Sequence, residues 1–534
     1  MTDYQYQLKR VVRGYCSANN LDLTTCITDF VSKKKQSVMR IHAGMTWPVT
    51  IPANTYVILD VDVELSTTNH YLIIGGSNIL ITSASGTTNV QNVSLYPGFI
   101  SNTTGTFSNI ICQNMELVSH TSTLLNLSGW FAQTTSYTNF INCSSTGPIS
   151  SGGGGIAGQY NYGTITRCNS KGDVGAVDSG GSGGGIAGDY NAGHIELCYS
   201  VGNLINNGAI GADAGETPVA TQGYAGGSGG SGGLICGNNN TGLVRACYAI
   251  GDINNFGGAG GMGSTPDPYV LHVNGGNGGI GGNGGSGGGI CGNTNSGSVI
   301  NCYYLGYIYC YGGTGGAGGD GNWETNGNGG AGGTGGSGSG ICGNSNSGAI
   351  SFCHSLTTLL NVGGNSGTPG TNASDGVGGS GGSGGGICGD SNANSVFGCY
   401  THGIINNYGG IGSSTGVIGS GGGICGDANA AVISNCYFRG KVSSTGTAAY
   451  GSGGIAGFVS TTGSPPQLTN CYVSAVIAEG NNPISNNTPQ VNCNQTVKWD
   501  SKIASATLIP QEIWCTSNVP YTLKVSFESA LNSC

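Results

Sequence analysis

The stretch GGGICGNTNSGSVINCYYLGYI, residues 287–308, carries no charged side chain, and close variants of it recur through the second half of the chain. Every copy contains one cysteine at a fixed position, which we call the ladder cysteine. The residue three before it and the residue six after it are apolar in all copies. Short segments rich in Ile and Val and bounded by Gly, Asn and Ser are typical of β-strands. The copies centre on eight cysteines: Cys168, Cys198, Cys247, Cys302, Cys353, Cys399, Cys436 and Cys471.

An asparagine recurs seven residues before the cysteine in the first seven copies. Asn tolerates the left-handed backbone region and can bond its own backbone, so the pattern predicts a tight corner and a stacked ladder of asparagines. Only the last copy lacks this residue, as expected for an atypical terminal repeat. The ladder residues are Asn161, Asn191, Asn240, Asn295, Asn346, Asn392 and Asn429.

The spacing of three between the apolar residue and the cysteine would put them on opposite faces of one strand. We therefore expect a bend between them, where Asn301, Asn435, Asn470 and Gly398 lie. Several short strands per turn, stacked in parallel, predict an all-β fold: a single-stranded right-handed parallel β-helix, or β-solenoid. Each buried Ile or Val contributes roughly 1.5–3 kcal/mol, enough to stabilise a shaft without salt bridges.

The repeat divides the chain into four segments. Residues 1–40 gather many of the basic side chains and predict an anchoring or capping segment, with a solvated charge run as the plainer alternative. Residues 41–150 alternate apolar and polar residues and predict the first coils. Residues 151–480 hold the eight repeats, and residues 481–534, with Trp499 and Trp514, predict a C-terminal cap.

Composition excludes several classes of protein. Charged residues make up only 7% of the chain, which argues against ordinary disorder. The 107 glycines keep no strict three-residue period and only 14 prolines are present, which excludes collagen. A net charge of −9 gives no basic footprint for nucleic acid, and no apolar run is long enough to span a membrane. The start of the chain lacks the apolar core of a secretory signal, so we expect synthesis and assembly in a reducing cytosol.

A second cysteine stands eleven residues before the first in five copies, where other copies have Ala157, Ala187 or Ala456. Interchange of Cys with Ala indicates small packed side chains, so ladders of free thiols are the preferred interpretation, with disulfides as the alternative. No CxxC pair or adjoining histidine supports a metal site, and no cofactor is expected.

Long glycine-rich inserts separate the copies. All should leave the solenoid at one corner and stack into a fin, because repeat-specific insertions map to one face. Extended polyglycine strands packed side by side are the preferred interpretation, with flexible Gly/Ser-rich linkers as the alternative. Their middles contain Asp267, Tyr269, His272, Trp323, Glu324 and Asp375, which could cluster at the tip. Aromatic faces with carboxylates and amides suit sugar binding; the alternative is that the aromatic residues only hold the loop tips together.

An enzymatic alternative depends on the stretch ILDVDVEL. In one strand, Asp60, Asp62 and Glu64 would share a face and leave Val61, Val63 and Leu65 on the other. Paired carboxylates can serve as general acid and base in glycoside cleavage, although an ordinary solvated strand face is the preferred interpretation. His194, His354 and His402 are interpreted as surface residues, and the tyrosine after most ladder cysteines predicts a stacking ladder.

The sentence GGGIAGDYNAGHIELCYSVGNL, residues 183–204, resembles the GLUG motif of bacterial surface proteins and adhesins, from residue 152 to about 478. The N-terminal third resembles pectin-lyase-like β-helices, and the chain is similar to β-helix proteins of giant viruses of amoebae and their virophages. The resemblance implies a virion protein that attaches to a glycan or surface receptor, contacts other virion proteins and forms a homotrimer, as viral fibres often do. A β-helix polysaccharide lyase or glycoside hydrolase is the alternative.

Overall fold

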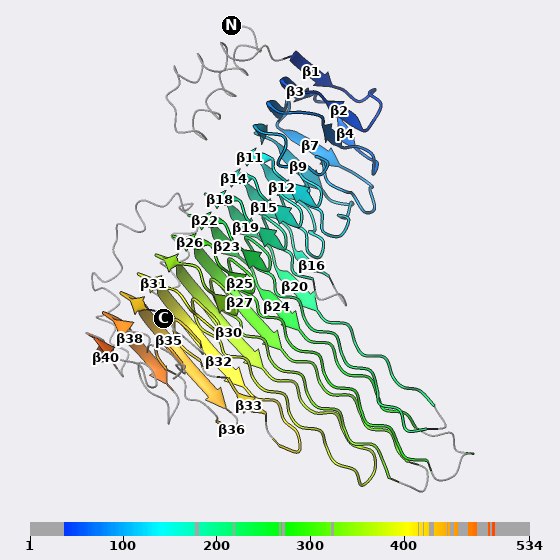
Figure 1. The fold of residues 1–534 in the computed structure, drawn as a ribbon, viewed down its shortest axis with the longest axis vertical. Coiled ribbons are helices and arrows are strands. Elements are labelled where there is room, and N and C mark those ends of the chain that lie inside the picture. The colour runs from blue at the N-terminus through cyan, green and yellow to red at the C-terminus, as the bar shows by residue number, and fades with distance from the viewer. Residues whose placement is uncertain are drawn as a thin grey trace.

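The computed structural model describes residues 37–176, 181–216, 219–265, 269, 273–321, 325–414, 416–419, 421–426, 432–445, 447–448, 453–457, 468–477, 490–491 and 494–496. Every strand pairing between the described strands is parallel, and each coil adds a strand to the same sheets (Figure 1). The chain is thus a parallel β-solenoid, which confirms the predicted fold class. Its right-handedness remains a prediction, favoured because crossovers between parallel strands of one sheet are nearly always right-handed.

Three sheets run along the shaft. Sheet 1 has 14 strands. In the repeats, its strands lie just before the ladder cysteines. Its strands are β1 (Ser37–Ile41), β3 (Thr55–Leu59), β6 (Ile79–Ser83), β8 (Ile110–Gln113), β11 (Asn139–Ile141), β14 (Thr164–Thr166), β18 (His194–Glu196), β22 (Leu243–Arg245), β26 (Ser298–Ile300), β29 (Ile350–Ser351), β31 (Val396–Phe397), β34 (Ile433–Ser434), β37 (Leu468–Thr469) and β39 (Gln490–Val491).

Sheet 2 has 16 strands and begins just after the ladder cysteine. Its strands are β4 (Glu64–Leu65), β7 (Thr87–Val90), β9 (Glu116–Ser119), β12 (Ser144–Thr146), β15 (Asn169–Lys171), β16 (Val174–Ala176), β19 (Tyr199–Val201), β20 (Leu204–Asn207), β23 (Tyr248–Ile250), β24 (Ile253–Phe256), β27 (Tyr303–Tyr311), β30 (His354–Val362), β32 (Tyr400–Tyr408), β35 (Tyr437–Thr445), β38 (Tyr472–Ile477) and β40 (Asn494–Thr496).

Sheet 3 has six short strands, five of which end in a ladder asparagine. They are β10 (Thr135–Ser136), β13 (Tyr160–Asn161), β17 (Tyr190–Asn191), β21 (Asn239–Asn240), β25 (Thr294–Asn295) and β28 (Ser345–Asn346). Two further pairs complete the described strands: β2 (Val49–Ile51) with β5 (Leu72–Ile74), and β33 (Val417–Ile418) with β36 (Thr447–Ala448).

The segment boundaries differ from the sequence pattern at both ends. β1 pairs with β3 from Ser37 onward, inside the segment predicted to anchor or cap the chain. β39 and β40 pair with β37 and β38, so two sheets continue into the predicted C-terminal cap. The remainder of both terminal segments lies outside the described residues. None of the described segments forms a helix with the length and apolar character that crossing a bilayer requires.

The core consists of the rows that the repeat predicts. Ile165, Ile195, Val244 and Val299 pair in register from coil to coil and are fully buried, and the later copies continue the row. The second apolar position is also buried, as Leu204, Ile253 and Ile308 show. Apolar contacts between identical positions therefore stabilise the shaft along its whole length.

The sharp corner lies one residue before each ladder cysteine. Asn301, Asn435 and Asn470 have φ of 54°, 54° and 51°, and Gly398 has φ of 62°. Arg167, Leu197 and Ala246 adopt the same left-handed conformation, although it is less favourable for these residue types than for Asn or Gly. The described ladder asparagines do not adopt this conformation. They lie instead at a second corner, where sheet 3 strands end before sheet 1 strands, and Asn161 Nδ2 donates to Gly163 O two residues on at 3.2 Å, so the predicted corner is present without the left-handed backbone.

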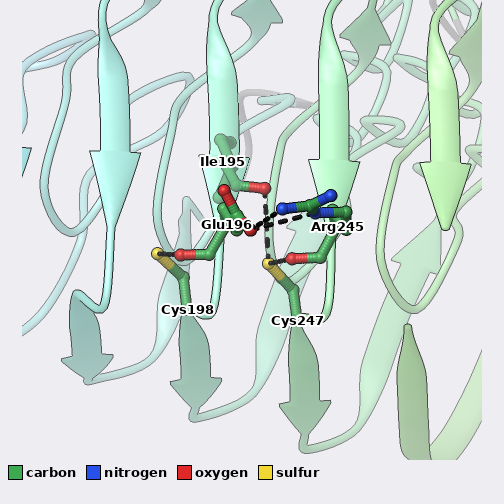
Figure 2. A network of polar contacts seen from close by, with 5 residues as sticks. All are labelled: Ile195, Glu196, Cys198, Arg245 and Cys247. Atoms are coloured by element: carbon green, nitrogen blue, oxygen red, sulfur yellow. Dashed lines mark hydrogen bonds and ion pairs between the residues drawn. The ribbon is translucent and has the colours of Figure 1, made fainter. Parts of the chain in front are cut away.

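The ladder thiols lie beside this corner. In Figure 2, the Sγ of Cys247 lies 3.6 Å from the carbonyl oxygen of Ile195 in the preceding coil and 3.2 Å from that of Arg245. The Nε of Arg245 donates to the Glu196 carboxylate at 2.9 Å on the outer face of the same two coils. A small polarisable donor fits a site where two carbonyl groups converge, which explains why cysteine recurs there.

All cysteines that the structure describes are free and buried. We therefore expect these sixteen thiols to be inert in the native protein and to react with a thiol reagent after unfolding without reductant. Burial raises the pKa of Cys310 to about 11, which suppresses the reactive thiolate at neutral pH. A disulfide between any two of these sixteen cysteines, detected by mass spectrometry of the unfolded and unreduced chain, would contradict the ladders.

Two histidines differ from the sequence interpretation. His354 occupies the tyrosine position of its coil and stacks on Tyr303, with ring centroids 5.1 Å apart. His354 and His402 are 2% and 4% exposed, so interpreting them as surface residues is wrong, whereas His194 is exposed. The expected tyrosine stacking is present, for example between Tyr199 and Tyr248 at 4.8 Å.

Mild acid should destabilise the fold through these two histidines. Burial lowers the pKa of His354 and of His402 to about 4, so the unfolded chain takes up protons first as the pH falls. The stability conferred by the neutral imidazoles is complete above pH ~6.5 and is lost as the pH falls toward about 4. Each histidine should lower the free energy of unfolding by about 2 kcal/mol between pH 7 and pH 5. Denaturant unfolding at both pH values measures the loss, which His354→Tyr should reduce by about half; an unchanged loss would contradict this account.

Candidate functional site

The glycine-rich inserts form an ordered fin beside the shaft. Five of the inserts each have a described outgoing leg that continues a sheet 2 strand and a described return leg that leads to the next coil, and these legs run side by side as wavy chains in Figure 1. The described outgoing legs are 208–215, 257–265, 312–321, 363–370 and 409–414. The described return legs are 219–231, 273–286, 325–337, 374–383 and 416–419.

Hydrogen bonds between glycines join the legs in a three-residue pattern. Gly278 donates its N–H to the Asn328 oxygen of the next return leg at 2.9 Å, and Gly279 donates to Gly261 of its own outgoing leg at 2.8 Å. Gly281 and Gly282 repeat the two bonds one triplet later. The period matches the three residues per turn of a polyproline II helix. The backbone N–H and C=O groups of neighbouring legs thus serve as hydrogen-bond partners for one another.

The triplet explains the glycine content. A Cβ on Gly281 or Gly282 would lie 2.0 Å from a backbone oxygen of a neighbouring leg, so neither position accepts a side chain. Every third residue is exposed instead, as at Asn274, Asn277, Ile280 and Asn283. This local period of three is visible in the sequence GGNGGIGGNGG, but it does not extend over the whole chain as it does in collagen.

The fin has two layers with different outer faces. Outgoing and return legs bond to each other through their glycines, so their third residues face opposite sides. On the return-leg face, amide oxygens link consecutive coils. Asn277 Oδ1 accepts from the Asn328 N–H at 2.9 Å, and Asn328 Oδ1 accepts from the Ser374 N–H at 3.1 Å.

A polar groove of about 730 Å³ crosses this return-leg face next to the fin tip. We call it the amide groove. Its lining carries no charge and consists of Ala220, Gln222, Asn274, Gly275, Gly276, Asn277, Thr325, Asn326, Asn328, Thr371, Asn372, Ala373 and Ser374.

The amide groove presents hydrogen-bond donors. Asn274 Oδ1 accepts from both the N–H and the Oγ1 of Thr325, at 3.1 and 2.8 Å. Because the oxygens of Asn274, Asn277 and Asn328 are used within the fin, their Nδ2 groups face outward. Among the described residues these groups have no acceptor, so they are available to a ligand.

Of the predicted tip residues, the structure describes only Tyr269 and Asp375. Tyr269 is 92% exposed, and Asp375 is exposed directly after Ser374 of the amide groove. Asp267, His272, Trp323 and Glu324 lie outside the described residues, so the clustering of all six remains a prediction.

The predicted asparagine ladder lies inside the shaft as a chain of amides. Asn191 Nδ2 donates to Asn240 Oδ1 at 2.8 Å, Asn240 to Asn295 at 2.7 Å and Asn295 to Asn346 at 2.6 Å. Asn161 and Asn392 extend the chain, and Asn429 lies outside the described residues. All eight ladder cysteines are buried.

A second asparagine row was missed by the sequence analysis. Amides of Asn206 and Asn255 lie 3.2 Å apart, and those of Asn361 and Asn407 lie 2.9 Å apart, at the base of the fin. Asn361 Oδ1 accepts from Gly338 N–H at 3.3 Å and so joins an outgoing strand to a return leg. The signal was an Asn eight residues after the ladder cysteine in four copies.

The proposed carboxylate row does not form. β3 ends at Leu59 and β4 begins at Glu64, so a turn separates Asp60 from Glu64. Val61, predicted to face inward, is 75% exposed, and Asp60 Oδ1 lies 2.7 Å from Arg40 Nη1 in an ion pair. The corner breaks the period of two that placed the three carboxylates on one strand face. Within the described ranges, no group of three or more His, Cys, Asp or Glu side chains is arranged to hold a metal ion.

The strand pairing and the fin define a parallel β-solenoid with a lateral, glycine-rich fin. No family model matches the chain, and no curated protein matches it. Among solved structures, it is similar to tailspike protein 3 of bacteriophage CBA120, with 12% sequence identity and a TM-score of 0.15. The match covers 89% of this chain but only 59% of the tailspike. The fold assignment therefore depends on the strand pairing described above.

Proposed function

We propose that the protein is an attachment protein whose fin binds glycans on a cell or virus surface. The amide groove is the observation that carries this proposal. It combines a volume of about 730 Å³ with a row of amide donors. The legs that carry these donors are held by backbone hydrogen bonds that recur every three residues. Hydroxyl and N-acetyl oxygens of a glycan would accept hydrogen bonds from such donors.

The expected glycan is neutral. No Lys or Arg occurs between Arg245 and Arg439, the part of the chain that contributes most of the fin. The described fin instead carries carboxylates such as Asp213 and Asp320, whose repulsion disfavours sialylated or sulfated ligands.

Binding to a glycan array tests the proposal. Asn277→Ala combined with Asn328→Ala should lower the affinity for neutral glycans about tenfold, or about 1.4 kcal/mol. Asn365→Ala is the matched control, because this exposed asparagine uses its Oδ1 in the same way, on the Ile411 N–H at 2.9 Å, but on the outgoing layer. Equal affinities of the double variant and the wild type would place binding elsewhere, and Trp323→Ala examines the tip separately.

We also propose that the protein is displayed on a virion, in line with its resemblance to GLUG-type adhesins and to β-helix proteins of giant viruses and virophages. Copurification with virus particles is the expected result. Light scattering on the purified protein tests the homotrimer, for which a mass three times that of the 53.1 kDa chain is expected.

A further inference from the structure

An aromatic cluster lies where the shaft passes into the fin. Along β27, Tyr309 and Tyr311 face outward while Ile308 and Cys310 are buried in the core. The rings of Tyr309 and Tyr311 have centroids 6.3 Å apart, and Phe256 of β24 packs edge-on against Tyr311 at 5.2 Å.

These rings border a hollow of about 510 Å³, which we call the aromatic hollow. Its remaining lining is Asn254, Gly257, Ala259, Gly312, Gly313 and Thr314. A Cβ on Gly257 or Gly313 would point into the fin lattice, 2.0 Å from Gly282 O or 1.9 Å from Gly258 O. The glycines therefore contribute bare backbone to the hollow, and the rings stay accessible.

The polar groups of the hollow are few and neutral. Asn254 and Thr314 supply an amide and a hydroxyl, and the Tyr309 and Tyr311 hydroxyls have no partner among the described residues. Both tyrosines are half-buried, and burial raises the pKa of each, with a further contribution at Tyr309 from the nearby Asp252 carboxylate. A tyrosine hydroxyl is protonated at neutral pH in any case and can donate. Apolar walls with a small number of polar groups, in a volume of this size, are typical of small-molecule sites.

We propose that the aromatic hollow binds one neutral pyranose unit, a hexose or an N-acetylhexosamine, against the faces of Tyr309 and Tyr311. The C–H face of a pyranose is apolar and suits an aromatic ring, while its ring of hydroxyls matches Asn254, Thr314 and the tyrosine hydroxyls. The inference rests on the proposed function for its ligand class but uses a different site, on the outgoing-leg side of the fin. Two sites on opposite sides let one protein join separate glycan chains, which increases avidity.

Saturation-transfer NMR on the full chain tests this proposal, with methyl β-glucopyranoside, methyl N-acetyl-β-glucosaminide and methyl β-glucuronide as probes. The neutral probes should bind the wild type, and Tyr309→Ala or Tyr311→Ala should weaken binding at least about tenfold. Tyr311→Phe should keep most of the affinity because the ring remains. Tyr162→Ala, which removes an exposed shaft tyrosine that stacks on Tyr137, is the matched control.

Three other outcomes would overturn the proposal, and each points to a different fault in it. Unchanged binding by both tyrosine variants, with loss only in the Asn277→Ala and Asn328→Ala double variant, removes the aromatic hollow and keeps the amide groove. Equal binding of the glucuronide removes the neutral ligand class. No binding of any probe or any array glycan by the wild type overturns both this inference and the proposed function. Intact protection of the buried thiols shows that the variants fold.

Discussion

Replacing Gly282 with alanine is expected to disorder the middle of the fin while leaving the shaft intact. The new Cβ would lie 2.0 Å from Gly227 O, and the backbone oxygen is part of a lattice that cannot shift locally without breaking bonds in neighbouring legs. Overpacking of this kind costs about 3 kcal/mol. Because each leg bonds to several others, the disorder should spread to the adjacent coils.

Hydrogen exchange measures this effect. Peptides within 257–286 and 312–337 should lose protection, whereas core strands β26 and β29 should keep it. The control is Ile280→Ala, two residues earlier at an exposed third position, where the side chain is 51% exposed and truncation removes no lattice contact. Equal protection in the two variants would show that the glycine bonds do not order the fin.

Asn295→Ala should strongly destabilise the shaft. Asn240 Nδ2 would lose its acceptor at 2.7 Å and keep only Gly242 O at 3.3 Å, and Asn346 Oδ1 would lose its donor at 2.6 Å. All three asparagines are buried. Each orphaned polar group costs about 1–3 kcal/mol, so we expect a loss of about 4 kcal/mol in the free energy of unfolding.

Denaturant unfolding of Asn295→Ala and Asn365→Ala gives the comparison. Asn365 is exposed, so its truncation should cost under about 1 kcal/mol. Asn295→Asp adds a pH test, because burial would raise the folded-state pKa of the new carboxyl above its unfolded value. Relative to the wild type at the same pH, its stability should then be highest at low pH and fall as the pH rises through the folded-state pKa. Equal stabilities of the two alanine variants would mean that the amide chain does not stabilise the shaft.

The sequence was sufficient for features that repeat at one position in every coil. The apolar rows, the thiol ladders and the corner at Asn301 follow from spacing alone, since solenoid neighbours are copies of one another. His354 could also have been placed, because it occupies the tyrosine position of its repeat.

Features that depend on contacts between coils were harder to predict. The alternation of Tyr307, Tyr309 and Tyr311 was visible, but the aromatic hollow requires the neighbouring Phe256 and the glycine backbone. The carboxylates of ILDVDVEL were misplaced because nothing in that stretch marks the corner after Leu59. The amide groove joins residues from four coils, and its donors become evident only once the oxygens of Asn274 and Asn277 are seen to be occupied.

The three-residue unit of the fin also constrains how such proteins can diverge. Adding one Gly-Gly-X triplet to each leg lengthens the fin by about 9 Å, since each residue of a polyproline II helix rises about 3.1 Å. Such insertions keep the hydrogen-bond register and leave every core position of the shaft unchanged, whereas insertions of one or two residues shift glycines out of register. Related chains should therefore differ in fin reach by multiples of three residues per leg, which allows the ligand-binding face to move outward during evolution without any cost to the folding of the shaft.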